Sequence, residues 1–148
     1  MEDLWSRINR SIPQYFESIS KKYNLNFMRL SDVKTAIFGN KFAIIICIGR
    51  FNVDILYAQN IDGERVVFQC GSFLAEKYTF EDRQNLLREE SVEDILCNNL
   101  KVIANGLESK WSSLLSGNEA WIADYKNSKW YTKINLLQEE DKILWELI

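Results

Sequence analysis

Apolar residues at the start of the chain recur every three or four positions, which is the period of an α-helix with one buried face. These residues are Leu4, Trp5, Ile8, Ile12, Tyr15, Phe16, Ile19 and Tyr23. Pro13 interrupts the pattern, and Ser11 and Gln14 around it have the spacing of a capping box. The pattern therefore predicts a short leading helix and then a second helix from about Ile12 to about Asn24.

From Phe27 onward the apolar period shortens towards two, and β-branched and aromatic residues become frequent, as in β-strands. Gly39-Asn40 and Asp62-Gly63 can supply the positive φ angles of two-residue hairpin turns. They predict two hairpins within an antiparallel four- to five-stranded meander. The strands expected from this pattern cover residues 33–38, 41–49, 51–60 and 64–70.

The run from Ala43 to Ile48 is apolar at every position. A strand that does not alternate is typical of the centre of a sheet that is covered on both faces. Helices are expected on one face. The C-terminal residues 139–148 are the expected cover of the other, because they begin acidic and end apolar.

The second half of the chain returns to the helical period. Thr79 with Asp82, and Ser91 with Asp94, have the capping spacing of helix starts. After Ser91 a row of apolar residues predicts a helix of about six turns, which Ser116-Gly117 would end. The residues of this row are Val92, Leu96, Leu100, Ile103, Leu107, Trp111 and Leu114.

The 148 residues are enough for a single domain with its own core, since 47% of them are hydrophobic and 13% are aromatic. No linker, low-complexity tract or internal repeat divides residues 1–148. We therefore expect one α+β domain, in which the N-terminal helix and the long helix of the second half pack on the meander.

The chain contains no histidine, which excludes His-containing catalytic triads, Cys-His pairs and zinc sites that need imidazole. Cys47, Cys70 and Cys97 form no C-x-x-C pair and are expected to be reduced, structural thiols. The six glycines form no phosphate-binding loop. Neighbouring carboxylates are typical of helix starts and surface charge. We therefore expect no catalytic residue, no cofactor and no bound metal.

The N-terminal residues 1–5 are acidic, unlike a secretory signal. The apolar run 42–48 is shorter than the roughly 20 residues that a membrane-spanning helix needs. These features predict a cytoplasmic protein that does not bind a membrane.

The charge is uneven along the chain, although the net charge is only −3. Residues 1–50 carry eight basic and four acidic side chains, whereas residues 51–148 carry ten basic and seventeen acidic ones. An acidic surface on the later part would repel nucleic acid and attract basic partners. The alternative is a solvated acidic face without a partner. The oligomeric state stays open.

The order of the elements resembles the small immunity proteins of bacterial contact-dependent inhibition and other polymorphic toxin systems. The resemblance lies in the leading amphipathic helix, the meander with Asp62-Gly63, and the sequence GLESKWSSLLSG at 106–117 followed by Trp121. It implies a non-enzymatic protein that neutralises a cognate toxin domain, frequently a basic nuclease, by covering its active site or substrate surface.

Aromatic residues among carboxylates are typical of protein interfaces, with apolar anchors inside a charged rim. The main predicted partner surface consists of Glu139, Glu140, Asp141 and Glu146 with Trp130, Tyr131 and Trp145. The second candidate consists of Glu89, Glu90, Glu93 and Asp94. The structural alternative is that the late tryptophans seal an edge of the core.

Two other functions fit the same composition. One is a small-ligand-binding protein or enzyme with a pocket on the concave face of the sheet. The other is an acidic secretion chaperone, which obligate dimerisation would favour. A deep pocket with converging polar groups would favour the first of these, and a filled core with an exposed acidic patch would favour the inhibitor.

Overall fold

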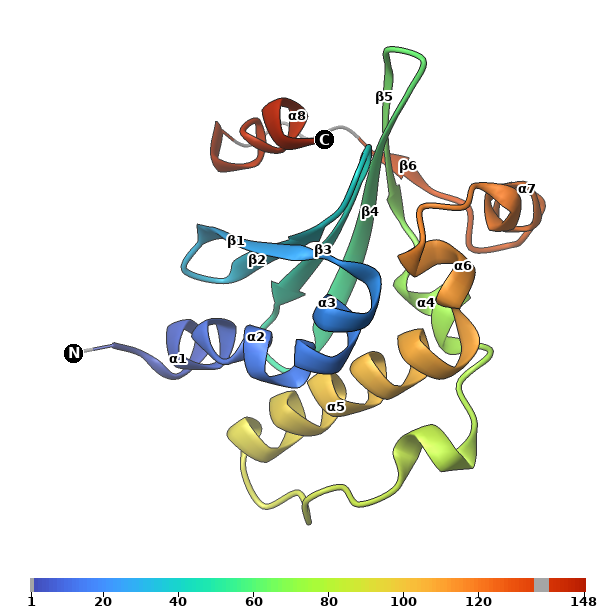
Figure 1. The fold of residues 1–148 in the computed structure, drawn as a ribbon. Helices are drawn as coiled ribbons and strands as arrows, with labels where there is room; N and C mark the ends of the chain where they lie inside the picture. Colours follow the sequence, from blue (N-terminus) through green and yellow to red (C-terminus); the bar gives the residue numbers. More distant parts are fainter. Residues whose placement is uncertain (1, 135–138) are drawn as a thin grey trace.

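An antiparallel sheet carries most of the helices on one of its faces in the computed structural model, which describes residues 2–134 and 139–148 (Figure 1). The long helix α5 crosses below this sheet, and the chain ends on the opposite side. The elements are α1 (Leu4–Arg10), α2 (Ile12–Tyr15), α3 (Glu17–Tyr23), β1 (Asn26–Ser31), β2 (Lys34–Phe38), β3 (Phe42–Ile48), β4 (Val53–Ile61), β5 (Glu64–Gln69), α4 (Gly71–Ala75), the 3-10 turn η1 (Phe80–Arg83), α5 (Val92–Lys110), α6 (Ser112–Leu115), α7 (Ala120–Lys126), β6 (Lys133–Ile134), the 3-10 turn η2 (Glu139–Asp141) and α8 (Leu144–Leu147).

The strands lie in the sheet in the order of the sequence, from β1 to β6, and every neighbouring pair is antiparallel. The α+β class and the meander are therefore confirmed. The described sheet has six strands, however, where four or five were predicted. The last strand, β6, is only two residues long and pairs with Val67 and Phe68 of β5. So short a strand has no apolar period by which it could be recognised.

The two predicted hairpin turns differ in outcome. Asp62 and Gly63 have φ angles of 51° and 82°, as a type I′ turn requires. Between β2 and β3, however, the positive φ of 69° belongs to Lys41, and the turn has three residues. Gly39 is needed there for space, because a Cβ atom would lie 2.8 Å from Cε1 of the buried Phe42 ring.

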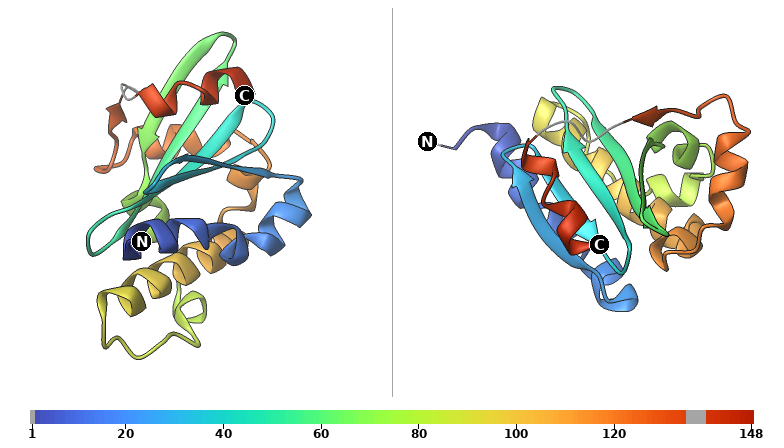
Figure 2. Two further views of the ribbon diagram at one scale, coloured as in Figure 1. Left: turned by 90° about the vertical axis from the view of Figure 1, so that its left-hand side faces the viewer. Right: turned by 90° about the horizontal axis from the view of Figure 1, so that it is seen from above.

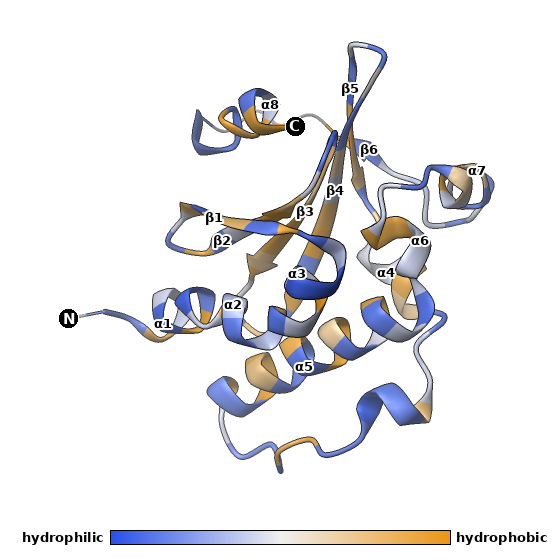
Figure 3. Ribbon diagram, in the orientation of Figure 1, coloured by the Kyte–Doolittle hydropathy of each residue, from blue (hydrophilic) through white to orange (hydrophobic). Residues whose placement is uncertain are grey.

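Strand β3 is the central strand, as predicted, and it is buried on both faces. Ile44 and Ile46 belong to the core beneath the helices, whereas Ala43 and Ile45 belong to a second core on the outer face. Figure 3 shows the resulting hydrophobic character of β3. Because both faces are apolar, each of them requires a cover.

The C-terminal residues provide the cover of the outer face, as their pattern predicted. Leu144 is fully buried there, against Ala43 and Ile45, while Leu147 and Ile148 pack around it. Seen from above, α8 lies along the outer side of β1 to β3 (Figure 2).

The predicted second helix, from about Ile12 to Asn24, is divided into α2 and α3. Phe16 breaks it, with φ −109° and ψ 16°, and this ring is completely buried. Ser11 does not cap α2 with its side chain, since its hydroxyl donates to the Ile8 carbonyl of α1. The helix is therefore interrupted at the residue whose ring is buried, Phe16.

The predicted long helix ends earlier than the apolar row suggested. It stops at Lys110, because Trp111 leaves the helical conformation (φ −127°, ψ 37°) and its indole N–H donates to the Leu74 carbonyl at 3.0 Å. The chain resumes as α6, which keeps Leu114 buried, and Gly117 follows with a φ of 78°. The predicted stop therefore ends α6 and not α5.

Candidate functional site

The aromatic members of the main predicted partner surface do not lie on one surface. Trp130 packs against the core beneath the helices and donates its indole N–H to Glu76, and the neighbouring Tyr131 is exposed. Trp145 belongs to the outer core, with the Arg65 guanidinium 5.5 Å from its ring centre. The two groups therefore lie on opposite faces of the sheet.

The carboxylates of that set also differ in their surroundings. Asp141 is only 3% exposed, and its carboxylate lies 3.0 Å from Nζ of Lys34 on β2. Glu140 approaches the same ammonium group at 3.6 Å, whereas Glu139 and Glu146 are exposed. The charge of Asp141 thus holds η2 on the sheet and is turned away from any partner.

The second predicted set lies together at the start of α5. Glu89, Glu90 and Glu93 are exposed, and Asp94 is half-buried. The Ser91 hydroxyl accepts a hydrogen bond from the Asp94 amide (3.1 Å), and the Asp94 carboxylate accepts one from the Glu90 amide (3.0 Å). Ser91 therefore caps the helix, and Asp94 fixes the residue before the cap. The three glutamates are exposed but have partners within the chain, since Glu93 pairs with Arg7 at 3.1 Å, Glu90 with Arg88 at 3.4 Å, and Glu89 accepts from Asn98.

Helix α5 holds residues 79–91, which we call the connecting segment, along its outer side (Figure 1). Asn98 donates to the Leu87 carbonyl and accepts from the Leu87 amide, both at 2.9 Å. Lys101 donates to the Asn85 carbonyl at 2.5 Å. Three polar residues at helical steps, Asn98, Lys101 and Asn105, thus satisfy backbone groups of a stretch that has little secondary structure of its own. A fourth, Ser109, donates its hydroxyl to the side chain of Asp82.

Asp82 is the main polar anchor of the connecting segment. Its carboxylate accepts hydrogen bonds from the Thr79 amide (2.8 Å) and the Ser109 hydroxyl (2.6 Å), and lies 3.3 Å from Nζ of Lys110. The predicted capping box of Thr79 and Asp82 is thereby confirmed, although it starts a 3-10 turn. Burial alone would raise the pKa of Asp82, but the bonds from Ser109, Thr79 and Lys110 hold this pKa below its usual value.

The connecting segment exposes two large apolar side chains. Phe80 is 79% exposed and Leu87 is 55% exposed. Carboxylates surround them in the sequence, since residues 76–94 contain seven acidic and three basic side chains. An ordered stretch thus presents apolar groups within an acidic surrounding.

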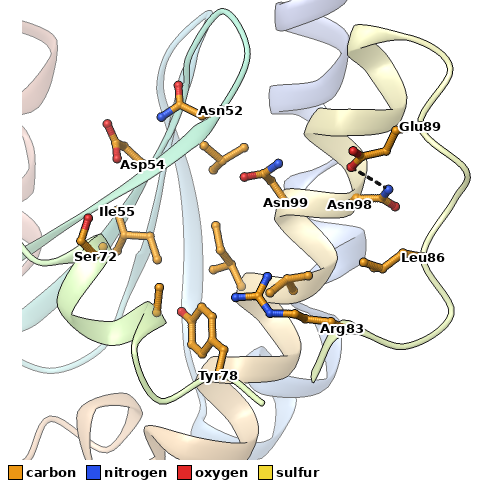
Figure 4. A pocket seen from close by; sticks show the side chains of 15 residues that line it. Asn52, Asp54, Ile55, Ser72, Tyr78, Arg83, Leu86, Glu89, Asn98 and Asn99 are labelled. Atoms are coloured by element: carbon orange, nitrogen blue, oxygen red, sulfur yellow. Dashed lines mark hydrogen bonds between the residues drawn. The ribbon is translucent and has the colours of Figure 1, made fainter. Parts of the chain in front are cut away.

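A groove of about 350 Å³, which we call the α5 groove, separates α5 and the connecting segment from α4 and the start of β4 (Figure 4). Val53 and Ile55 of β4 and Val102 and Ile103 of α5 give it apolar walls. Its polar groups are contributed by Asn52, Asp54, Ser72, Tyr78, Arg83, Glu89, Asn98 and Asn99.

The Tyr78 ring is fixed at one end of the α5 groove. It lies so close to Gly106 of α5 that an added Cβ atom would be 2.2 Å from Cε1 of the ring. The Tyr78 hydroxyl is buried and has no hydrogen-bond partner among the described residues. Burial raises the pKa of this hydroxyl, so it remains protonated at neutral pH.

Among the residues that line the groove, Glu89 was predicted only as a member of the second partner surface, and Tyr78, Arg83 and Asn99 were not predicted at all. The polar row on α5 was the available signal, because Asn98, Lys101, Asn105 and Ser109 recur at helical steps beside the apolar row. No periodic pattern in the sequence marks Tyr78 as a residue of the groove.

Two of the three cysteines, Cys47 and Cys70, lie in surroundings that disfavour the thiolate. Burial raises the pKa of Cys47 to about 11 and that of Cys70 to about 12, so neither thiol ionises readily. No group of three or more Cys, Asp or Glu side chains that could hold a metal ion occurs in the described part of the chain. None of the helices in residues 2–134 and 139–148 combines the length and the apolar character that crossing a membrane requires.

Comparisons with protein-family models, with curated proteins and with solved structures found no match to this chain.

Proposed function

We propose that the chain is a non-enzymatic domain that binds and neutralises a basic protein partner, as immunity proteins neutralise toxins. The binding surface is the connecting segment together with the start of α5. It replaces the main predicted set at the C-terminus, whose members are divided between two faces of the sheet.

The observation that carries this proposal is the exposure of Phe80 and Leu87 on a segment that is already ordered. Because α5 holds the backbone, little conformational entropy remains to be lost on binding. Apolar anchors of this kind can each contribute more than about 2 kcal/mol when a partner desolvates them. Glu89, Glu90 and Glu93, which follow Leu87 along the chain and are exposed, would accelerate the encounter with a cationic surface.

The test begins with capture of the partner by the full chain and production of the chain with that partner in one cell. We expect a basic protein whose toxicity the chain abolishes. Phe80→Ala with Leu87→Ala should accelerate dissociation about tenfold or more. Glu89→Lys with Glu90→Lys should slow association, most strongly at low salt.

The matched control is Glu139→Lys with Glu146→Lys, which reverses two exposed carboxylates outside the proposed surface. This variant should bind like the wild type. If only the Glu139→Lys, Glu146→Lys variant lost binding, the partner would bind the C-terminal residues and not the connecting segment. A partner without toxicity, or one that is acidic, would refute the inhibitory function.

A second candidate function, binding of a small ligand, is favoured by the α5 groove. Its volume of about 350 Å³ lies within the range of small-molecule sites, roughly 300–1,000 Å³. Its apolar walls and its few polar groups have the composition that such sites usually have.

A further inference from the structure

The buried hydroxyl of Tyr78 is a hydrogen-bond donor without an acceptor. A buried donor that stays unpaired destabilises the folded chain. The Tyr78 ring cannot move into α5, because it already lies against Gly106. Tyr78 forms part of the lining of the α5 groove, so the groove is the side on which this side chain can turn its hydroxyl toward an acceptor.

Arg83 supplies a cation at the same end of the groove (Figure 4). The carboxylate of the neighbouring Asp82 is bonded to Ser109 and Lys110. Glu89 accepts a hydrogen bond from Asn98 at 3.2 Å. Among the described residues, the Arg83 guanidinium has no carboxylate partner within ion-pair distance.

Two carboxylates, those of Asp54 at the start of β4 and Glu89 in the connecting segment, also belong to the lining of the groove. A ligand with one carboxylate beside Arg83 would satisfy the guanidinium and the hydroxyl together. A second carboxylate would add to the negative charge of Asp54 and Glu89 and be repelled.

We propose that the α5 groove binds a small monocarboxylate with an apolar body, whose carboxylate accepts hydrogen bonds from Arg83 and from the Tyr78 hydroxyl. The apolar body lies along Val53, Ile55, Val102 and Ile103. This inference rests on the second candidate function and does not require the protein partner.

The test is a titration of the purified full chain with 4-phenylbutyrate. Binding is monitored through the NMR signals of the backbone amides and the side chains. The control ligand is 4-phenylbutanamide, which has the same apolar body but a neutral amide in place of the carboxylate. We expect saturable binding of the acid with shifts confined to the groove, and at least tenfold weaker binding of the amide. Because no partner protein is present, the result is independent of the proposed inhibitory function.

Three variants make the test specific. Arg83→Gln should weaken binding about tenfold or more, and Tyr78→Phe about fivefold. Tyr78→Phe should also leave the unfolding free energy unchanged or raise it, because it removes an unpaired buried hydroxyl. Arg88→Gln is the matched control; Arg88 is highly exposed, pairs with Glu90 and lies outside the groove lining, so binding should be unchanged.

Four results would overturn the inference. The first is the absence of saturable binding up to about 10 mM acid, which corresponds to a binding free energy weaker than roughly −3 kcal/mol. The second is equal binding of acid and amide, and the third is equal weakening by Arg83→Gln and Arg88→Gln. A high-resolution structure with ordered water alone on the Tyr78 hydroxyl at saturating acid would also contradict it.

Discussion

Gly106 shows how one missing Cβ atom determines the position of a distant side chain. In the middle of α5 a glycine weakens the helix by roughly 1 kcal/mol relative to alanine. A side chain at this position would clash, because the Tyr78 ring occupies the space where the Cβ atom would be. Neither residue alone reveals this contact, since 28 positions separate them.

We predict that Gly106→Ala destabilises the protein by about 2 kcal/mol or more, because the displaced Tyr78 ring costs more than the gain in helix propensity. Chemical denaturation measures the change. The same substitution in a Tyr78→Ala background should be neutral or stabilising, since the clash is then absent. If Gly106→Ala changed the free energy of unfolding equally in both backgrounds, the position of the Tyr78 ring would not depend on Gly106.

At the scale of the element, α5 uses its sides differently. One side buries Leu96, Leu100 and Leu107 beneath the sheet. Another carries the polar row that holds the connecting segment. Periodicity predicted the apolar side, because burial follows directly from the spacing of apolar residues. The use of the polar side could not be predicted, since solvent-facing and segment-binding asparagines have the same spacing.

The attachment of the segment through Asp82 should depend on pH. Because the pKa of Asp82 is lowered in the folded state, its contribution is complete above the unfolded pKa of about 3.9 and is lost as pH falls through the folded value. The difference in unfolding free energy between wild type and Asp82→Asn should therefore be constant from about pH 7 to 5 and shrink between about pH 4 and 2.

Urea denaturation at a series of pH values measures this difference. Glu81→Gln is the control, because Glu81 is adjacent and exposed, and its effect should be small at every pH. A difference for Asp82→Asn that is as large at pH 2 as at pH 7 would mean that the carboxylate charge does not stabilise the segment.

At the scale of the whole molecule, the sheet has two cores. Helices cover one face, and ten C-terminal residues, 139–148, provide much of the cover of the other. The ion pair of Asp141 and Lys34 and the burial of Leu144 hold these residues in place. The outer core is the smaller one, so each of its side chains carries a larger share of the attachment.

We predict that Leu144→Ala lowers the free energy of unfolding by about 2–4 kcal/mol, because it leaves a cavity on the outer face of the sheet. Ile143→Ala is the matched control, since Ile143 is 41% exposed, and its effect should stay within about 1 kcal/mol. Thermal or chemical denaturation distinguishes the two. A small effect at Leu144 would show that the C-terminal cover contributes little to stability.

The sequence by itself determined the α+β class, the antiparallel meander, the central position of β3, the cover from the C-terminal residues and the start of α5. Each of these depends on local spacing or on the burial of continuous apolar runs, which neighbouring residues specify. Only the tertiary structure decided that Asp141 is turned inward, that Trp130 and Trp145 are on opposite faces, and that Tyr78 and Arg83 meet in one groove. These relations follow from how whole elements pack on one another, which the local spacing of residues does not specify.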